Sequence, residues 1–197
     1  MCARLSTLIL LLALPVSAAA QAVTWTIDPG HSAALFTVRH MLVASVRGEF
    51  DGPAGTIVFD PKDIAATLNV QATISTKTVS TRNADRDKDL KSALFFDVGK
   101  YPQIKFVSKR ADAAGPGRLK VTGDLTLHGV TKEVVLDVEG PTPAVKDIWG
   151  QMRVGATATT VLDRRAFGLV YNELLEGGGA VVGNDVNVTI DLEAAHK

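Results

Sequence analysis

Apolar and polar residues alternate along most of the chain after residue 22. Between residues 34 and 40, for example, Ala34, Phe36 and Val38 share one parity, whereas Leu35 and Arg39 have the other. A period of two is typical of strands that bury one face. The segments with this pattern are 24–27, 34–40, 46–50, 56–59, 67–75, 104–109, 119–127, 134–138, 154–162 and 185–192.

Short turns rich in glycine, proline and aspartate join many of these segments, such as Asp28-Pro-Gly30 and Asp51-Gly-Pro-Ala-Gly55. Short connections favour antiparallel pairing of consecutive strands. About eight of the segments are long enough for a barrel wall, and a barrel of that size can hold one small ligand. The pattern therefore predicts an all-β fold, an eight-stranded antiparallel up-and-down barrel. A sandwich of two sheets is the structural alternative.

One segment, residues 83–92, breaks the alternation. It is charged, lacks β-branched residues, and has Leu90 and Leu94 at helical spacing around its end. This composition predicts one short inserted helix with a solvated face. Ser80 or Thr81 is expected near its N-cap because hydroxyl side chains accept hydrogen bonds from the first turn.

The first residues of the chain have the parts of a cleavable secretory signal. Arg4 supplies a positive charge, residues 8–14 are uninterruptedly apolar, and residues 17–20 are small. The apolar run is shorter than the about 20 residues that span a bilayer, which argues against a permanent membrane anchor. The single cysteine, Cys2, precedes this run, an order that argues against a lipoprotein. We expect a signal peptide at 1–20, one domain at 21–197, and export to the periplasm.

Charge and cysteine content narrow the function classes. The chain has 21 basic and 21 acidic residues, so removal of Arg4 leaves 20 against 21 and a formal charge of −1. This balance predicts neither nucleic-acid binding nor attraction to an anionic membrane surface, and we expect no stable membrane insertion. Because no cysteine follows residue 20, the mature chain can form neither a disulfide framework nor a thiol nucleophile.

Motifs for catalysis or cofactor binding are missing from the sequence. It has no G-x-S-x-G elbow and no dinucleotide fingerprint, and the glycine-rich stretch 177–183 suits a hairpin turn better than a phosphate loop. The histidines lack the spacing of a metal-binding helix. Asp28, His31 and Ser32 crowd a single turn, whereas a triad needs a base placed between two separated partners. We predict no catalytic residue, no metal and no cofactor, and hence a protein that is not an enzyme.

A binding cavity is the more promising site. Phenylalanines occur on several different strands, and small residues such as Ala72, Ala156 and Ala158 share the alternating faces, which favours open space inside a barrel. A solid interior is the alternative. His40 has the parity of the apolar face of its strand, so it is either a satisfied core histidine or a contact for a polar ligand group. Arg47 lies near a strand end and could reach a barrel mouth.

Several motifs make the chain similar to the YceI-like family of polyisoprenoid-binding periplasmic proteins. The most specific is Gly123-Asp-Leu-Thr-Leu-His-Gly-Val-Thr-Lys132. The other matching pieces, in order along nearly the whole mature chain, are Trp25-Thr-Ile-Asp28, His31-Ser32, Phe36-Thr-Val-Arg-His40, Arg47-Gly-Glu-Phe50, Gly55-Thr-Ile-Val-Phe-Asp-Pro61, Arg86-Asp-Lys-Asp-Leu90, Tyr101-Pro-Gln-Ile-Lys-Phe106, Arg164-Arg-Ala-Phe-Gly-Leu169 and residues 182–191.

The resemblance implies an extended lipocalin-like barrel with an added helix. It implies an amphiphile with a long apolar tail in the lumen, such as a polyprenyl phosphate or an isoprenoid quinone, carried for transport, storage or sequestration, and it places His40 on the inner face. Other amphiphiles, such as a fatty amide, a fatty acid or a hydrophobic drug, are alternatives. A hydrolase of lipid head groups and an adhesion or stress module with an unused cavity are more distant ones. A homodimer is plausible for the family.

The tail would provide affinity and the head group selectivity, because burial of methylene groups does not distinguish one tail from another. For the head group the candidates are His40, Arg47 and Asn172. The full set of expected ligand-binding residues is Phe36, Val38, His40, Arg47, Phe50, Ile57, Phe59, Ile104, Phe106, Leu125, Leu127, Phe167 and Asn172.

Overall fold

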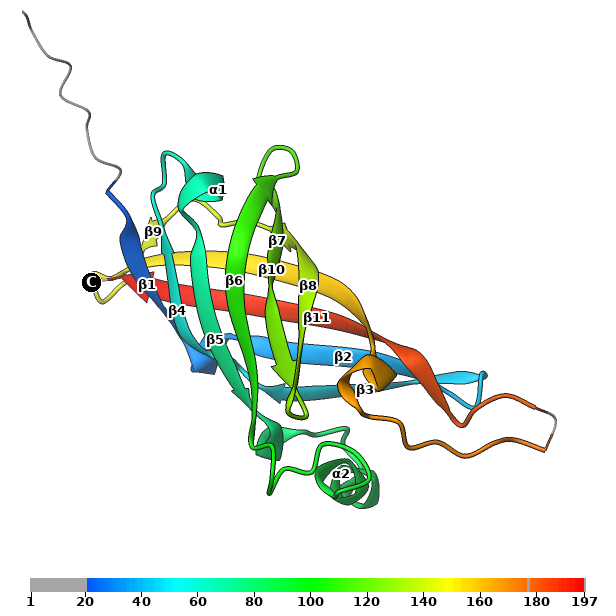
Figure 1. The fold of residues 1–197 in the computed structure, drawn as a ribbon. Helices are drawn as coiled ribbons and strands as arrows, with labels where there is room; N and C mark the ends of the chain where they lie inside the picture. The colour runs from blue at the N-terminus through cyan, green and yellow to red at the C-terminus, as the bar shows by residue number, and fades with distance from the viewer. Residues whose placement is uncertain (1–20, 177, 197) are drawn as a thin grey trace, which may run out of the picture.

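A computed structural model describes residues 21–176 and 178–196 (Figure 1). The expected signal peptide at 1–20 lies outside the described residues. The strands are β1 (Val23–Ile27), β2 (Ala33–His40), β3 (Ala44–Asp51), β4 (Ala54–Phe59), β5 (Asn69–Ser75), β6 (Gln103–Ala113), β7 (Arg118–Leu127), β8 (Val130–Glu139), β9 (Val145–Lys146), β10 (Met152–Asp163) and β11 (Val182–His196). The helices are α1 (Ile64–Thr67) and α2 (Ala84–Lys91), with 3-10 turns η1 (Pro29–His31), η2 (Thr76–Thr78) and η3 (Arg164–Phe167).

The strands form one antiparallel sheet that closes on itself. From β1 the order runs through β4, β5, β6, β7, β8 and β10 to β11, and β11 pairs back with β1. This circuit is a closed eight-stranded barrel, so the predicted fold class is confirmed and the sandwich alternative is wrong. Closure gives each of these strands a neighbour on both sides, although β8 meets β10 in only three residue pairs, and it removes the free edges of an open sheet.

Strand β11 ties the barrel to the β2–β3 hairpin. On one edge it pairs with β10 without interruption from Met152↔His196 to Asp163↔Asp185. On its other edge it pairs with β1 near the C-terminus and with β2 earlier, from Asp191 back to Val182. The hairpin β2–β3 therefore continues the wall past the end of β1 and projects beyond the rest of the barrel (Figure 1).

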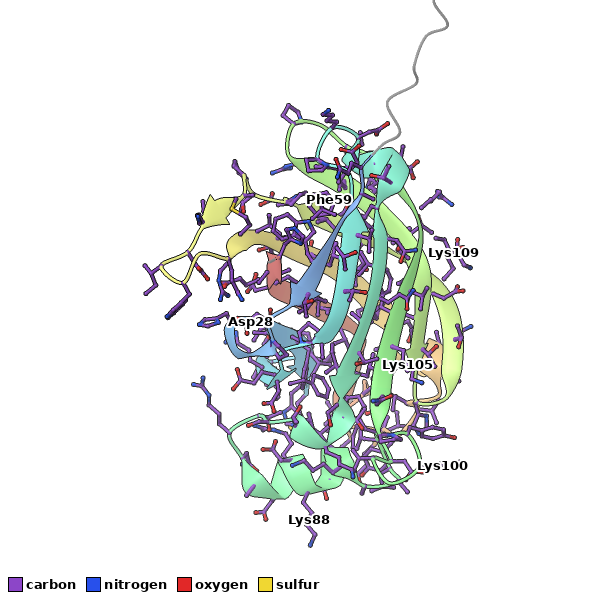
Figure 2. The ribbon with its side chains drawn as sticks, turned by 90° about the vertical axis from the view of Figure 1, so that its left-hand side faces the viewer. Asp28, Phe59, Lys88, Lys100, Lys105 and Lys109 are labelled. Atoms are coloured by element: carbon purple, nitrogen blue, oxygen red, sulfur yellow. The ribbon has the colours of Figure 1, made fainter. Side chains whose placement is uncertain are left out.

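The alternation of the sequence sorts side chains into an inner and an outer face. In β6, Ile104 and Phe106 point inward, while Lys105 and Lys109 extend from the outer face, as Figure 2 shows for the two lysines. The Nζ of Lys109 lies 2.6 Å from a carboxylate oxygen of Asp124 on the neighbouring strand β7. Because a pleated strand turns successive side chains to opposite faces, a polar outside and an apolar inside follow directly from the sequence.

The predicted helix is present as α2, but its N-cap is not the expected residue. Asn83 caps the helix, and its Oδ1 accepts a hydrogen bond from the backbone N–H of Arg86 at 3.0 Å. Thr81 instead donates its backbone N–H and its hydroxyl to the carboxylate of Asp87. The backbone of Ser80 forms a bridge with Glu49 of β3, which anchors the helical segment to the barrel.

Two short elements were absent from the prediction. The helix α1 covers Ile64 to Thr67, so the strand expected from residue 67 begins at Asn69 instead. The side chain of Asp63 caps α1 by accepting a hydrogen bond from the N–H of Ala66. A helix of four residues is too short to leave a clear periodic pattern in the sequence, so this cap was its main local signal. The two-residue strand β9 has exposed side chains and pairs with β10. None of the described helices is long and apolar enough to cross a membrane.

The cap of α2 gives a direct test of this local structure. Asn83→Ala removes the side-chain acceptor of the first turn and should lower the free energy of unfolding by about 1 kcal/mol. Ser80→Ala is the matched control and should change stability much less, because Ser80 joins the sheet through its backbone and its hydroxyl accepts only one long bond, 3.4 Å from the N–H of Arg82. Urea unfolding followed by circular dichroism measures both. An equal loss in the two variants would contradict the assignment of Asn83 as the cap.

Candidate functional site

The barrel encloses a cavity of about 270 Å³ between its inward-facing side chains. An apolar cavity of about 150 Å³ is enough to stay dry and bind benzene. The lumen is therefore large enough for a hydrocarbon chain, and the solid interior that the sequence left open is wrong for this protein.

The wall of the cavity is almost entirely apolar. In the part of the chain that the structure describes, Thr160 and Arg164 are the only lining residues with polar side chains. Water in such a space would lack the two to four polar partners that a buried water needs. Apart from the residues already expected to bind ligand, the wall includes Ala34, Val70, Ala72, Ile74, Leu119, Val121, Val134, Leu136, Val138, Ala156, Ala158, Leu162, Val186, Val188, Ile190 and Leu192.

Aromatic pairs pack toward two ends of the barrel. At the end near α1, the indole of Trp25 stacks on Phe59 with the ring centroids 5.8 Å apart. At the end near α2, Phe50 contacts Phe36 at 5.7 Å and Phe96 at 5.4 Å. Aromatic pairs in these arrangements add to the stability that comes from burial.

The segment of α2 contributes to the lumen, which the sequence analysis missed. Leu90 of the helix and Phe95 and Phe96 of the following turn line the cavity. The ring of Phe95 also contacts Tyr171, with the centroids 5.2 Å apart. The paired phenylalanines directly after a charged helix were the available signal, because two adjacent large apolar residues in a solvated segment need a surface to cover.

Nine of the thirteen expected ligand-binding residues line the cavity. They come from β2 to β7 and meet although they are far apart in the sequence. Whether they bind ligand stays a prediction. These nine are Phe36, Val38, Phe50, Ile57, Phe59, Ile104, Phe106, Leu125 and Leu127.

Four expected residues lie elsewhere, and three of them are the head-group candidates. His40 is half-buried but outside the lining, because β11 has a bulge between its pairings with Val38 and His40 and the hairpin leaves the barrel there. Arg47 is exposed on the outer face of β3. Phe167 is buried behind the wall of the lumen: it packs with the lining residues Leu127 and Leu169 but does not itself line the cavity.

Asn172 is the fourth, and its amide holds a loop. The Nδ2 donates to the carbonyl of Val182 at 2.7 Å, while the Oδ1 accepts from the N–H groups of Glu173 and Val182. Because backbone groups bond to both Nδ2 and Oδ1, the side chain of Asn172 fixes the loop that leads into β11. Its expected head-group role is not supported by this geometry.

Arg164 is a buried cation at the lumen wall. Its guanidinium donates to the carbonyls of Gly183 at 2.8 Å, Tyr171 at 2.9 Å and Val182 at 3.2 Å, and also to that of Leu169. Burial lowers the pKa of Arg164 from its ordinary value. Four carbonyl dipoles take the place of a carboxylate partner, so the side chain pins the loop between η3 and β11 onto the barrel.

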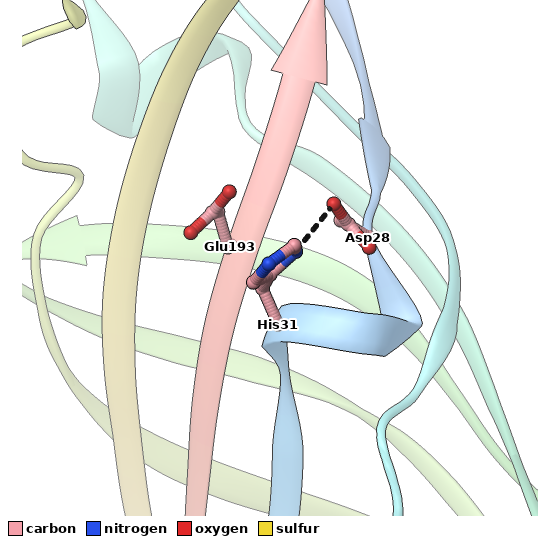
Figure 3. A group of neighbouring side chains, drawn as sticks. All are labelled: Asp28, His31 and Glu193. Carbon is pink, nitrogen blue, oxygen red and sulfur yellow. Dashed lines mark hydrogen bonds and ion pairs between the residues drawn. The ribbon is translucent and has the colours of Figure 1, made fainter. Parts of the chain in front are cut away.

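Asp28, His31 and Glu193 form a polar cluster at the outer surface, away from the lumen (Figure 3). The Nδ1 of His31 lies 2.9 Å from an oxygen of Asp28. The hydroxyl of Ser32 donates to the carbonyl of Asp28 and accepts from the N–H of Glu193. The Ser32 hydroxyl is therefore engaged by backbone groups in this turn.

Arg153 occupies the centre of this cluster. Its guanidinium lies 2.9 Å from Asp28, 2.7 Å from Asp147 and 2.5 Å from Glu193. Hydrogen bonds from His31 first and Arg153 second lower the pKa of Asp28 from 3.8 to about 2, and Arg153 also lowers that of Asp147. The carboxylates already have Arg153 as a cationic partner. The cluster is therefore explained by a structural role, because its ion pairs join β1, β10 and β11.

Comparisons with known proteins agree with this geometry. The family model described as a YceI-like domain matches residues 25–194. A UPF0312 protein from Staphylococcus aureus is 34% identical over 169 residues, which cover 86% of this chain and 95% of the relative. A Campylobacter jejuni YCEI protein has a similar structure, with a TM-score of 0.67 and 29% identity over 81% of this chain and 90% of that one.

A more distant structure shares the fold alone. It is a polyisoprenoid binding domain from Saccharophagus degradans implicated in plant cell wall breakdown. Its TM-score is 0.63 at 16% identity, and the match covers 88% of this chain and 98% of that domain.

The cluster around Arg153 predicts a loss of stability in acid. Because folding lowers the pKa of Asp28, its ionised form stabilises the folded state fully above about pH 4, and this contribution is lost as the pH falls through about 2. Asp28→Asn should be less stable than the wild type at pH 7, with the difference narrowing in that acid range. Urea unfolding at a series of pH values measures this.

Asp112→Asn is the control, since Asp112 pairs with Arg110 at an exposed site. It should leave the pH profile nearly unchanged. If the difference in free energy of unfolding between the wild type and Asp28→Asn stays constant down to pH 2, the assigned role of Asp28 is contradicted.

Arg164 gives a second prediction. Arg164→Met keeps much of the volume but leaves four carbonyls without a charged donor, so the free energy of unfolding should fall by about 3 kcal/mol. Arg165→Met, which alters the exposed pair with Asp163, should have little effect. Thermal unfolding measures both, and equal effects would contradict a special role for Arg164.

Proposed function

The chain belongs to the YceI-like family, and on that premise we propose that it carries an isoprenoid-like amphiphile with the apolar tail held inside the barrel. The observation that supports this most is the enclosed lumen of about 270 Å³ with an almost wholly apolar wall. A polyprenyl phosphate or an isoprenoid quinone has a tail of this kind. The polyisoprenoid binding domain of Saccharophagus degradans shares the fold and supports the same class of ligand.

The energetics of the tail favour a closed barrel over an open groove. Removal of one methylene group from water contributes about 0.8 kcal/mol, so one five-carbon isoprene unit contributes roughly 3 kcal/mol before the entropic cost of binding. Because burial of methylene groups does not distinguish one tail from another, the tail provides affinity without much selectivity.

Carriage is favoured over catalysis. Among the described residues, no histidine or carboxylate lines the cavity, whereas hydrolysis of a head group needs a general base within hydrogen-bonding reach of its substrate. The one histidine–carboxylate pair of the polar cluster, His31 with Asp28, lies at the outer surface. We therefore infer transport, storage or sequestration without turnover.

The site of action is part of the same proposal. Residues 1–20 have the composition of a secretory signal, which supports export to the periplasm. The intact mass of the protein recovered from the periplasm should correspond to a chain that begins close to residue 21. A cytoplasmic protein that keeps these residues would overturn the localisation and leave the lumen unaffected.

Extraction of the purified protein tests the function. Organic extraction followed by mass spectrometry should release an isoprenoid lipid in a fixed ratio to protein. Ala156→Phe fills the lumen from β10 and should reduce the extracted lipid by about tenfold, because each displaced methylene group weakens binding.

Thr159→Phe is the matched control on the outer face of the same strand, and it should keep the wild-type lipid content. If Ala156→Phe does not fold, Ala72→Phe fills the lumen from β5. Recovery of a fatty acid, a fatty amide or another amphiphile would change the class of ligand but would leave the proposed carrier function in place. Recovery of no amphiphile from the wild type would overturn the proposal.

A further inference from the structure

Two segments far apart in the sequence meet beyond the end of the barrel wall. The turn between β2 and β3 lies against the loop before β11, and the N–H of Met41 donates to the carbonyl of Val181 at 2.8 Å. The side chain of Leu42 lies beside Gly179 in that loop. In Figure 1 both segments project away from the barrel on the same side.

This projection ends in large apolar side chains that face solvent. We call these four residues the apolar tip: Met41, Leu42, Val43 and Leu174, whose exposed fractions are 43%, 61%, 80% and 85%. Single exposed apolar residues are ordinary, but a group at the end of a projection marks a surface that binds something apolar.

The backbone of the turn gives a second, independent observation. Val43 donates its N–H to the carbonyl of His40, and the two central residues, Met41 and Leu42, have φ values of 49° and 62°. The hairpin loop has three residues, because His40 pairs with Ala44. Two successive left-handed residues at the centre of a β-turn are the conformation for which asparagine and glycine are preferred. Met and Leu are poor choices for this geometry, so the turn is better explained by what its side chains contact than by its own stability.

The apolar tip continues the wall of the lumen. Val38 and Val182 line the cavity, and Val182 pairs with His40, the residue that directly precedes the tip. An apolar chain that moves between the tip and the lumen at this end meets mainly hydrocarbon, because the polar groups of Arg164 and Asn172 are occupied by backbone partners.

A second group of exposed apolar residues projects from another part of the barrel, and its surroundings are ionic. Ile148 and Trp149 are exposed in the turn before β10, but that turn is held by Asp147, which pairs with Arg153. The ionic cluster around Arg153 therefore lies next to this projection. Val182 of the lumen wall directly follows Val181, which accepts a hydrogen bond from Met41 of the tip, whereas four residues separate Trp149 from Val154, the nearest lining residue along its chain. The tip is therefore the nearer point of contact with the lumen.

We propose that the apolar tip inserts into the surface of a lipid bilayer and docks the lumen on the membrane that supplies or receives the lipid. This inference rests on the proposed carrier function, because a water-insoluble cargo has to enter and leave through an apolar environment. Exposed charges near the tip are of both signs, with Arg39 and Arg47 against Glu173 and Glu176. Binding therefore depends on apolar insertion and only weakly on salt. A few side chains give reversible docking, as a carrier that shuttles requires.

Flotation with phosphatidylcholine vesicles tests the proposal, because these lipids have no net charge. The protein recovered from the periplasm should float with the vesicles. The variant Leu42→Ser, Val43→Ser, Leu174→Ser should reduce the floating fraction by about tenfold, since three exposed apolar side chains no longer insert. The matched control is Ile148→Ser, Trp149→Ser, which also removes exposed apolar residues and should float like the wild type.

A single-site readout keeps the test valid if the triple variant does not fold. The sequence after residue 20 has no cysteine, so Leu42→Cys can carry one environment-sensitive fluorophore. Its emission should shift to shorter wavelength on addition of vesicles, and the same label at Ile148→Cys should not respond.

Three outcomes overturn the docking. They are flotation of the tip variant at the wild-type level, an equal loss in both variants, and sedimentation of the wild type as a dimer that the tip variant converts to a monomer without any effect of vesicles. The lipid content measured by extraction separates the two proposals. A protein that retains lipid but does not float refutes the docking alone, whereas one that floats but contains no lipid supports the docking and refutes the carrier.

Discussion

The pairing of β11 along both of its edges is the constraint on which the other features depend. β10 pairs along one edge of β11, and β1 and β2 pair one after the other along the opposite edge. This arrangement turns an open sheet into a barrel and at the same time lets the β2–β3 hairpin extend past β1. Without it, the inner faces of the strands would meet water, and the apolar residues would collapse onto one another or bind another chain.

A closed sheet of eight strands leaves a space that its own side chains fill only in part. Small residues such as Ala72, Ala156 and Ala158 face inward and keep the middle of the lumen open, while the aromatic clusters around Trp25 and Phe50 pack toward its ends. The charges are placed where they do not disturb this space. The charge of Arg164 is stabilised by backbone carbonyl groups that accept its hydrogen bonds, and the cluster around Arg153 lies outside. The apolar wall is what makes a hydrocarbon chain a suitable occupant and a polar substrate an unsuitable one.

The barrel and most of its lining could be predicted from the sequence because both follow from a period of two. The parity of Phe36 and Val38, or of Ile104 and Phe106, determines which face of the strand they occupy. Parity does not say where a strand leaves the barrel. His40 has the parity of the lumen but lies past the bulge of β11, and Arg47 has the opposite parity.

Residues outside the strands were harder still, because their positions depend on contacts between distant segments. Asn172 and Arg164 hold the loop before β11 through hydrogen bonds to its backbone, which no local pattern in the sequence indicates. Phe95 and Phe96 reach the lumen only because the segment of α2 folds back under the barrel. A dry apolar lumen that holds a lipid chain is the central claim, and a crystal structure of the protein purified from its own periplasm tests it most directly. We predict continuous chain-shaped electron density along the lumen, in contact with Phe36 and Phe106. Ordered water molecules in the lumen, or side chains collapsed into it, would contradict the account.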